Sequence, residues 1–172
     1  VSSSPMIVVM RSGRARMSAV YKFLRGLDPN TRDASPERRE ERLTLLEHAT
    51  DSCLDPTTWR DYMLRVVHAG FVSEGLVPST SAVVNAYALY VQGRERGVPK
   101  NRLDEAISRW LFGTLLTSRY SSSSESTFEE DLARLREVAS GDQDRWLNVL
   151  DGLLDDVLTD DYWTRTLPAV LE

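Results

Sequence analysis

One segment near the middle of the chain, residues 82–91 (AVVNAYALYV), is apolar around nearly its whole helical circumference and is interrupted only by Asn85. Its alanines and an expected length of more than ten residues favour a helix, although the composition also suits a strand. A helix that is apolar on all sides is typical of the buried centre of a bundle. The sequence therefore predicts a helical bundle with this segment as its central helix.

Amphipathic segments, with apolar residues three and four positions apart, lie on both sides of that central segment. Helix signals bound several of them: Ser35-Pro36 and Asp55-Pro56 are typical starts, and Gly70 and Gly141 are typical ends. The predicted helices cover about residues 14–27, 35–53, 55–70, 82–92, 101–119, 126–141 and 146–158. We therefore predict an all-α fold, a bundle of about six to eight helices, preceded by a short irregular or strand-like N-terminal segment.

The chain has 172 residues, of which 41% are apolar and 27% are charged, as in ordinary globular proteins. We predict a single helical domain over residues 1–172. A loop of turn and cap residues, 28–35 (DPNTRDAS), is the best internal boundary. The chain begins with Val1 instead of Met, which favours a fragment of a larger protein.

Cysteine content and hydropathy indicate the compartment. Cys53 is the only cysteine, so an internal disulfide is excluded and a reducing environment is favoured. No apolar run reaches the roughly 18 residues that a membrane span needs. The basic residues near the N-terminus follow its short apolar run, whereas a secretory signal carries them before it. We predict a cytoplasmic protein with no membrane partner.

Catalytic and metal-binding patterns are missing from the sequence. His48 and His68 lack the spacing of a metal site and adjoin predicted core positions, so we assign them structural roles. No glycine-rich phosphate loop is present. The paired acids Asp155-Asp156 and Asp160-Asp161 suggest a solvated helix face more strongly than a carboxylate site. We therefore predict no catalytic residue, no metal and no cofactor for this chain.

Charge is distributed unevenly along the chain, although the formal net charge is only −5. Residues 1–27 contain five cations and no acid, while residues 101–172 contain 15 acids and 7 bases. The N-terminal cations include Arg11, Arg14 and Arg16, which are candidate contacts to phosphate. The alternative is that this basic end pairs with the acidic half of the same domain.

A serine run, Ser121 to Ser124, separates two amphipathic segments and directly follows Arg119-Tyr120. A guanidinium, an aromatic ring, hydroxyls and free amides at a helix end suit phosphate or sugar contacts. The alternative is a flexible linker followed by a helix cap. The candidate DNA- or phosphate-binding residues are Arg119, Tyr120, Ser121, Ser122, Arg11, Arg14 and Arg16.

Four short motifs surround this run: NAYALY (85–90), ISRWLFGTLLTSRYS (107–121), SEST (124–127) and EEDL (129–132). With VVHAGFVSEGLVPSTSAVV (66–84) before them, they resemble the helical region of the GmrSD-type restriction proteins, large bacterial phage-defence proteins that attack modified DNA or sense DNA modification. The resemblance covers about Trp59 to Val138.

Such proteins typically carry a ParB-like nucleotide-hydrolysing region with an Asp-Gly-Gln-Gln-Arg signature, and often a His-Asn-His nuclease. This sequence contains neither signature, so the resemblance carries over no catalytic residue. It implies a helical module that helps to bind DNA or couples nucleotide state to a nuclease in a larger defence protein, which would be a nucleotidase or endonuclease as a whole. The alternative is an interaction or homo-oligomerisation module without nucleic-acid contact, using aromatics such as Tyr162 and Trp163.

Overall fold

The computed structural model describes residues 17–27, 33–73, 77, 79–121 and 123–171, without the side chains at positions 17–20, 45, 46, 48, 49, 52, 170 and 171. Within these ranges the chain forms eight α-helices, one π-helical turn and no strand, so the predicted all-α fold is confirmed. The predicted irregular or strand-like start lies outside the described residues. The elements are α2 (Met17–Leu24), α3 (Pro36–Leu54), α4 (Pro56–His68), α5 (Thr80–Glu95), α6 (Lys100–Leu116), α7 (Ser124–Arg136), α8 (Gln143–Asp155), η2 (Tyr162–Thr166) and α9 (Leu167–Leu171).

Side-chain caps fix the beginnings of four described helices, including α5, where Ser79 accepts a hydrogen bond from the Ala82 amide at 3.3 Å. Ser35 accepts a hydrogen bond from the Arg38 amide at the start of α3. Asp55 accepts bonds from the amides of residues 57 and 58 at the start of α4. Both starts agree with the sequence, because a cap residue followed by proline satisfies free amides and presets the first helical φ. Helix α8 begins at Gln143, three residues earlier than predicted, because Asp142 caps it.

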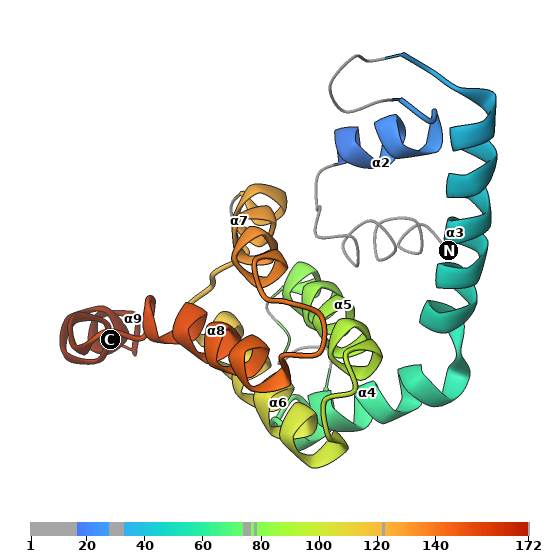
Figure 1. Ribbon diagram of the computed structural model, residues 1–172. Helices are drawn as coiled ribbons and strands as arrows, with labels where there is room; N and C mark the ends of the chain where they lie inside the picture. Colours follow the sequence, from blue (N-terminus) through green and yellow to red (C-terminus); the bar gives the residue numbers. More distant parts are fainter. Residues whose placement is uncertain (1–16, 28–32, 74–76, 78, 122, 172) are drawn as a thin grey trace.

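Helix α5 lies in the middle of the bundle (Figure 1), as its apolar sequence predicts. Its buried residues are Ala82, Asn85, Ala86, Tyr87, Ala88, Leu89, Tyr90, Val91, Gln92 and Gly93. Helices α5 and α6 pack so closely that a Cβ at Gly93 would come within 2.4 Å of Leu103 Cδ1. The absence of a side chain at this position therefore allows the two central helices to approach each other.

Two terminal parts project from the bundle (Figure 1). Helix α3 extends away from α5 and α6 and packs mainly against α2 and α4. At the other end, η2 is tied to the bundle by the Tyr162 hydroxyl, which donates to the Leu116 carbonyl at 2.9 Å. The described helices include none that is both long and apolar enough to span a membrane.

Candidate functional site

The turn after α6 determines where Arg119 and Tyr120 lie. The helix was predicted to run to about Arg119 but ends at Leu116, because Ser118 adopts a left-handed φ of 50°. The Arg119 amide then donates to the Thr114 carbonyl at 3.0 Å, and the Ser118 amide to the Leu115 carbonyl at 3.2 Å. This is the usual hydrogen-bond pattern of a left-handed helix end. Glycine normally marks such an end, so the serine gives no stop signal in the sequence.

That turn directs Arg119 and Tyr120 onto Asp131 of α7, and we call these three residues the corner. The Arg119 guanidinium donates to the carboxylate through Nε at 3.1 Å and Nη2 at 2.5 Å. The Tyr120 hydroxyl donates to Oδ2 of the same carboxylate at 2.6 Å. Asp131 is only 1% exposed and Tyr120 only 3%. The corner is therefore a closed network in which both carboxylate oxygens accept charged or polar donors.

Electrostatics keep the donors of the corner protonated. Burial raises the pKa of Tyr120 well above its usual value, and the adjacent Asp131 charge raises it further. Burial alone would lower the pKa of Arg119, but the hydrogen bonds and negative charge of Asp131 outweigh burial and raise it. The corner thus holds a charged guanidinium and a neutral phenol against one carboxylate.

The candidate contact residues are therefore in different situations. Arg119 and Tyr120 direct their polar atoms into the protein, whereas Ser121 is exposed. Ser122, Arg11, Arg14 and Arg16 lie outside the described residues. Helix α7 begins at Ser124 with Ser123 as its cap residue, so it starts two residues before the predicted cap, Ser126. The part of the serine run that is described therefore leads directly into a helix.

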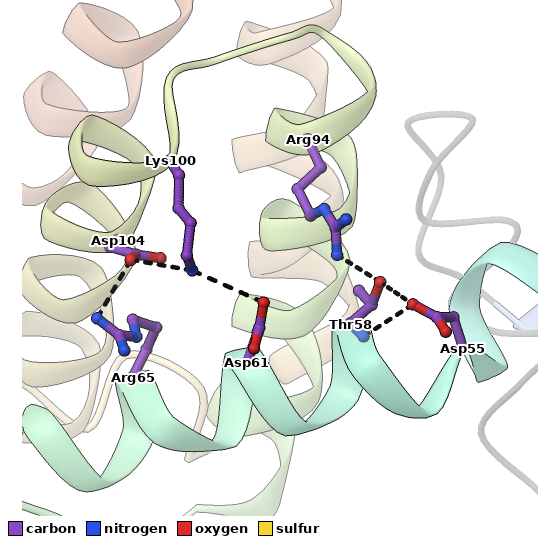
Figure 2. Close-up of polar contacts among 7 residues, drawn as sticks. All are labelled: Asp55, Thr58, Asp61, Arg65, Arg94, Lys100 and Asp104. Carbon is purple, nitrogen blue, oxygen red and sulfur yellow. Dashed lines mark hydrogen bonds and ion pairs between the residues drawn. The ribbon is translucent and has the colours of Figure 1, made fainter.

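A second polar cluster lies between α4 and the connection from α5 to α6, and Figure 2 shows it. We call it the cleft; its residues are Asp55, Thr58, Asp61, Arg65, Arg94, Lys100 and Asp104. At one end, Arg94 of α5 donates to the Thr58 hydroxyl, which in turn donates to Asp55 at 2.6 Å. Hydrogen bonds from the Thr58 hydroxyl and amide lower the pKa of Asp55. This chain of bonds joins the start of α4 to the end of α5.

At the other end of the cleft, Asp104 of α6 meets two cations. Its Oδ2 lies 3.2 Å from Arg65 Nη1 and 3.3 Å from Lys100 Nζ. Lys100 also faces Asp61, but at 3.8 Å. Asp104 Oδ1 and Arg65 Nε are buried and have no hydrogen-bond partner in the described part of the chain. Polar atoms in the cleft are therefore less completely paired than those in the corner.

Two features of the sequence point to the cleft, although none of its residues is among the predicted site residues. Asp55, Thr58, Asp61 and Arg65 recur every three or four residues, which places them along one face of α4. The connection 94–102 (RERGVPKNR) holds four cations and one acid. What the sequence lacks is any sign that these two segments, separated by 28 residues, face each other.

Comparison with protein-family models, curated proteins and solved structures finds no match for this chain. Among the described residues, no three or more His, Cys, Asp or Glu side chains come together in a way that could hold a metal ion.

Proposed function

We propose that the chain is a helical module of a GmrSD-like phage-defence protein that works in the cytoplasm and couples nucleotide state to a nuclease elsewhere in that protein. The observation that carries the proposal is the corner. Arg119 and Tyr120 come from the RYS motif and Asp131 from the EEDL motif, so two separate parts of the resemblance meet in one buried network. These motifs therefore specify how the helices of the bundle pack. That suits a module that passes nucleotide state to a nuclease and does not itself catalyse a reaction.

The other motifs of the resemblance also consist largely of buried residues. From NAYALY, Tyr87 and Tyr90 are buried, and from ISRWLFGTLLTSRYS, Ile107 and Trp110 are fully buried. Rigid packing of this kind suits a part that holds neighbouring regions in a fixed relation. The motifs thus support a shared helical scaffold, while the reaction itself is assigned to the other regions.

DNA contact by the bundle is the less favoured role. Three exposed arginines on α6 and α7 are paired with aspartates of α8 or its end: Arg102 with Asp144, Arg109 with Asp151, and Arg134 with Asp156. Such pairing neutralises these three cations, which therefore attract a phosphate backbone only weakly. We assign any DNA contact to the N-terminal cations Arg11, Arg14 and Arg16.

Phage challenge tests this proposal. Cells expressing the whole coding sequence that contains this chain are infected with phages carrying modified or unmodified DNA, and plating is compared with an empty vector. We expect plating of the modified-DNA phage to fall, and Asp131→Asn to restore it because the corner breaks. Arg134→Gln, which removes an exposed pair, is the matched control and should keep protection. Equal plating of both phages on all strains would refute the proposal.

A gel-shift titration tests the DNA role separately. If the N-terminal cations grip duplex DNA, the purified chain shifts it at low salt, and added salt weakens the shift steeply. Replacing Arg11, Arg14 and Arg16 with glutamine should then abolish binding. Absence of a shift at low salt would reject the DNA role and leave the coupling role to the phage experiment.

Exposed aromatic side chains favour a second candidate, an interaction module without nucleic-acid contact. Phe112 is 51% exposed and Trp163 is 45% exposed, although large apolar residues are costly in water. A molar mass that rises with concentration in light scattering, and that Trp163→Ser lowers, would support self-association. A constant monomeric mass would exclude homo-oligomerisation.

A further inference from the structure

The cleft opens beside Lys100 into a surface hollow of about 200 Å³. Two cations, one acid, a tyrosine and two apolar side chains line it: Asp61, Tyr90, Arg94, Val98, Lys100 and Leu103. One water molecule takes about 30 Å³ of liquid volume, so the hollow has room for about six or seven groups of that size. This is the scale of a small metabolite.

Tyr90 is the only tyrosine among the residues that line the hollow. Three tyrosines pack together here, and two of them donate their hydroxyls inside the protein: Tyr62 to the Val83 carbonyl at 2.5 Å and Tyr87 to the Cys53 carbonyl at 2.6 Å. Tyr90 as a whole is only 2% exposed and lines the hollow, and no hydrogen bond joins its hydroxyl to the described residues. The hydroxyl is not one of the buried, unpaired polar atoms of the described residues, so a molecule in the hollow can reach it. The Tyr90 hydroxyl is therefore a donor available to a molecule in the hollow, and burial raises its pKa, so it stays protonated.

Two charged groups of the lining also have unused capacity. Asp61 accepts no hydrogen bond from the described part of the chain, and its nearest cation, Lys100, is 3.8 Å away. Arg94 donates to Thr58 through one of its guanidinium nitrogens, and the described residues accept nothing from its others. The hollow thus offers hydrogen-bond donors on one side and a carboxylate acceptor on the other.

Charge defines the class of ligand. Arg94, Lys100 and Asp61 give the lining alone a formal charge of +1, and with the neighbouring Asp55, Arg65 and Asp104 the charges of the cleft sum to zero. The planar guanidinium of Arg94 suits a single carboxylate, whereas a phosphate dianion would bring a second negative charge towards Asp61. Asp61 in turn requires a donor on the ligand.

We propose that this hollow binds a small carboxylate that also carries an amino or hydroxyl group, of the α-amino or α-hydroxy acid type. The ligand carboxylate accepts from Arg94, Lys100 and the Tyr90 hydroxyl, and its amino or hydroxyl group donates to Asp61. The apolar residues Val98 and Leu103 face the short carbon chain. This inference is independent of the defence role proposed above.

The proposal is tested by titrating the isotope-labelled protein with small molecules and following the NMR chemical shifts of the backbone amides of residues 90–104. The probes are L-alanine and lactate, compared with acetate, which lacks the donor, and with inorganic phosphate. We expect saturable shifts with L-alanine or lactate, and affinity at least about ten-fold weaker for acetate, equivalent to one lost hydrogen bond. Absence of saturable shifts with both probes would overturn the site. Phosphate binding more tightly than either would overturn the ligand class.

Variants distinguish binding in the hollow from non-specific binding to the protein surface. Tyr90→Phe removes a hydroxyl that has no partner, so the protein should fold normally while the affinity for the bound probe falls about ten-fold. Asp61→Asn should weaken L-alanine more than acetate. Arg102→Gln is the control, because Arg102 is a nearby exposed cation on α6 that pairs with Asp144 instead. Unchanged affinity in both Tyr90→Phe and Asp61→Asn would contradict the proposal.

Discussion

The corner and the cleft both set arginines against aspartates, yet they differ in how completely their polar atoms are paired. In the corner, Asp131 is 1% exposed and both of its oxygens accept hydrogen bonds. In the cleft, Asp104 Oδ1 has no partner among the described residues, and Lys100 is 62% exposed. A fully paired network stabilises the folded state. An incompletely paired network beside a hollow still has polar atoms that can bind a ligand.

Breaking the corner should have the largest effect. Asp131→Asn leaves the Arg119 guanidinium, only 14% exposed, without its counter-charge. We expect the free energy of unfolding to fall by about 3 kcal/mol, as for other buried pairs that lose one partner. Urea denaturation followed by circular dichroism measures this. The control, Arg134→Gln, removes an exposed pair and should cost less than about 1 kcal/mol. Similar losses in both variants would erase the distinction between a buried pair and a surface pair.

Alkaline pH should have the next largest effect, because it weakens the corner. The pKa of Tyr120 is raised in the folded protein, so its stabilising contribution is complete below the unfolded pKa of about 10. It is lost as pH rises from there through the folded pKa, because the unfolded chain releases the proton first. Urea midpoints measured between about pH 8 and 11 should therefore decline above pH 10.

Tyr120→Phe should make that decline shallower. Part of it should remain, since burial also raises the pKa of Tyr87 to about 12. At neutral pH the same variant should cost about 1.5–3 kcal/mol, because it loses a hydrogen bond to a charged acceptor. A pH dependence identical to that of the wild type would show that Tyr120 titrates normally.

Removing one charge from the cleft should have the smallest effect on the free energy of unfolding. Lys100→Met removes an exposed ammonium from two weak ion pairs while keeping its apolar stem. We expect the free energy of unfolding to change by no more than about 0.5 kcal/mol. A loss close to that of Asp131→Asn would mean that the cleft is a structural network like the corner.

Periodicity was enough to predict most of the fold. The all-round apolar composition of 82–91 predicts the buried α5, and Ser35-Pro36 and Asp55-Pro56 predict the starts of α3 and α4. The end of α6 was wrong by about three residues because a serine, Ser118, takes the left-handed position that glycine usually occupies. Local sequence signals therefore locate helices well where standard cap residues are used.

The sites were harder to predict because both depend on contacts between distant segments. The sequence singles out Arg119 and Tyr120 as candidate contacts, but nothing local indicates that Asp131 accepts hydrogen bonds from both. The cleft similarly requires α4 to face the connection between α5 and α6. Which charges meet is decided by tertiary packing, and a single sequence does not encode that in its spacing.

A double-mutant cycle on Arg119 and Asp131 tests the central claim most directly, namely that the corner is a closed structural pair. The free energies of unfolding are measured for Arg119→Met, Asp131→Leu and the double variant. We predict a coupling energy of about 2 kcal/mol or more, with the double variant well above the stability expected from the two single losses, because neither charge is then buried alone. Losses that add to within about 0.5 kcal/mol would contradict the account, since the two side chains would then be energetically independent.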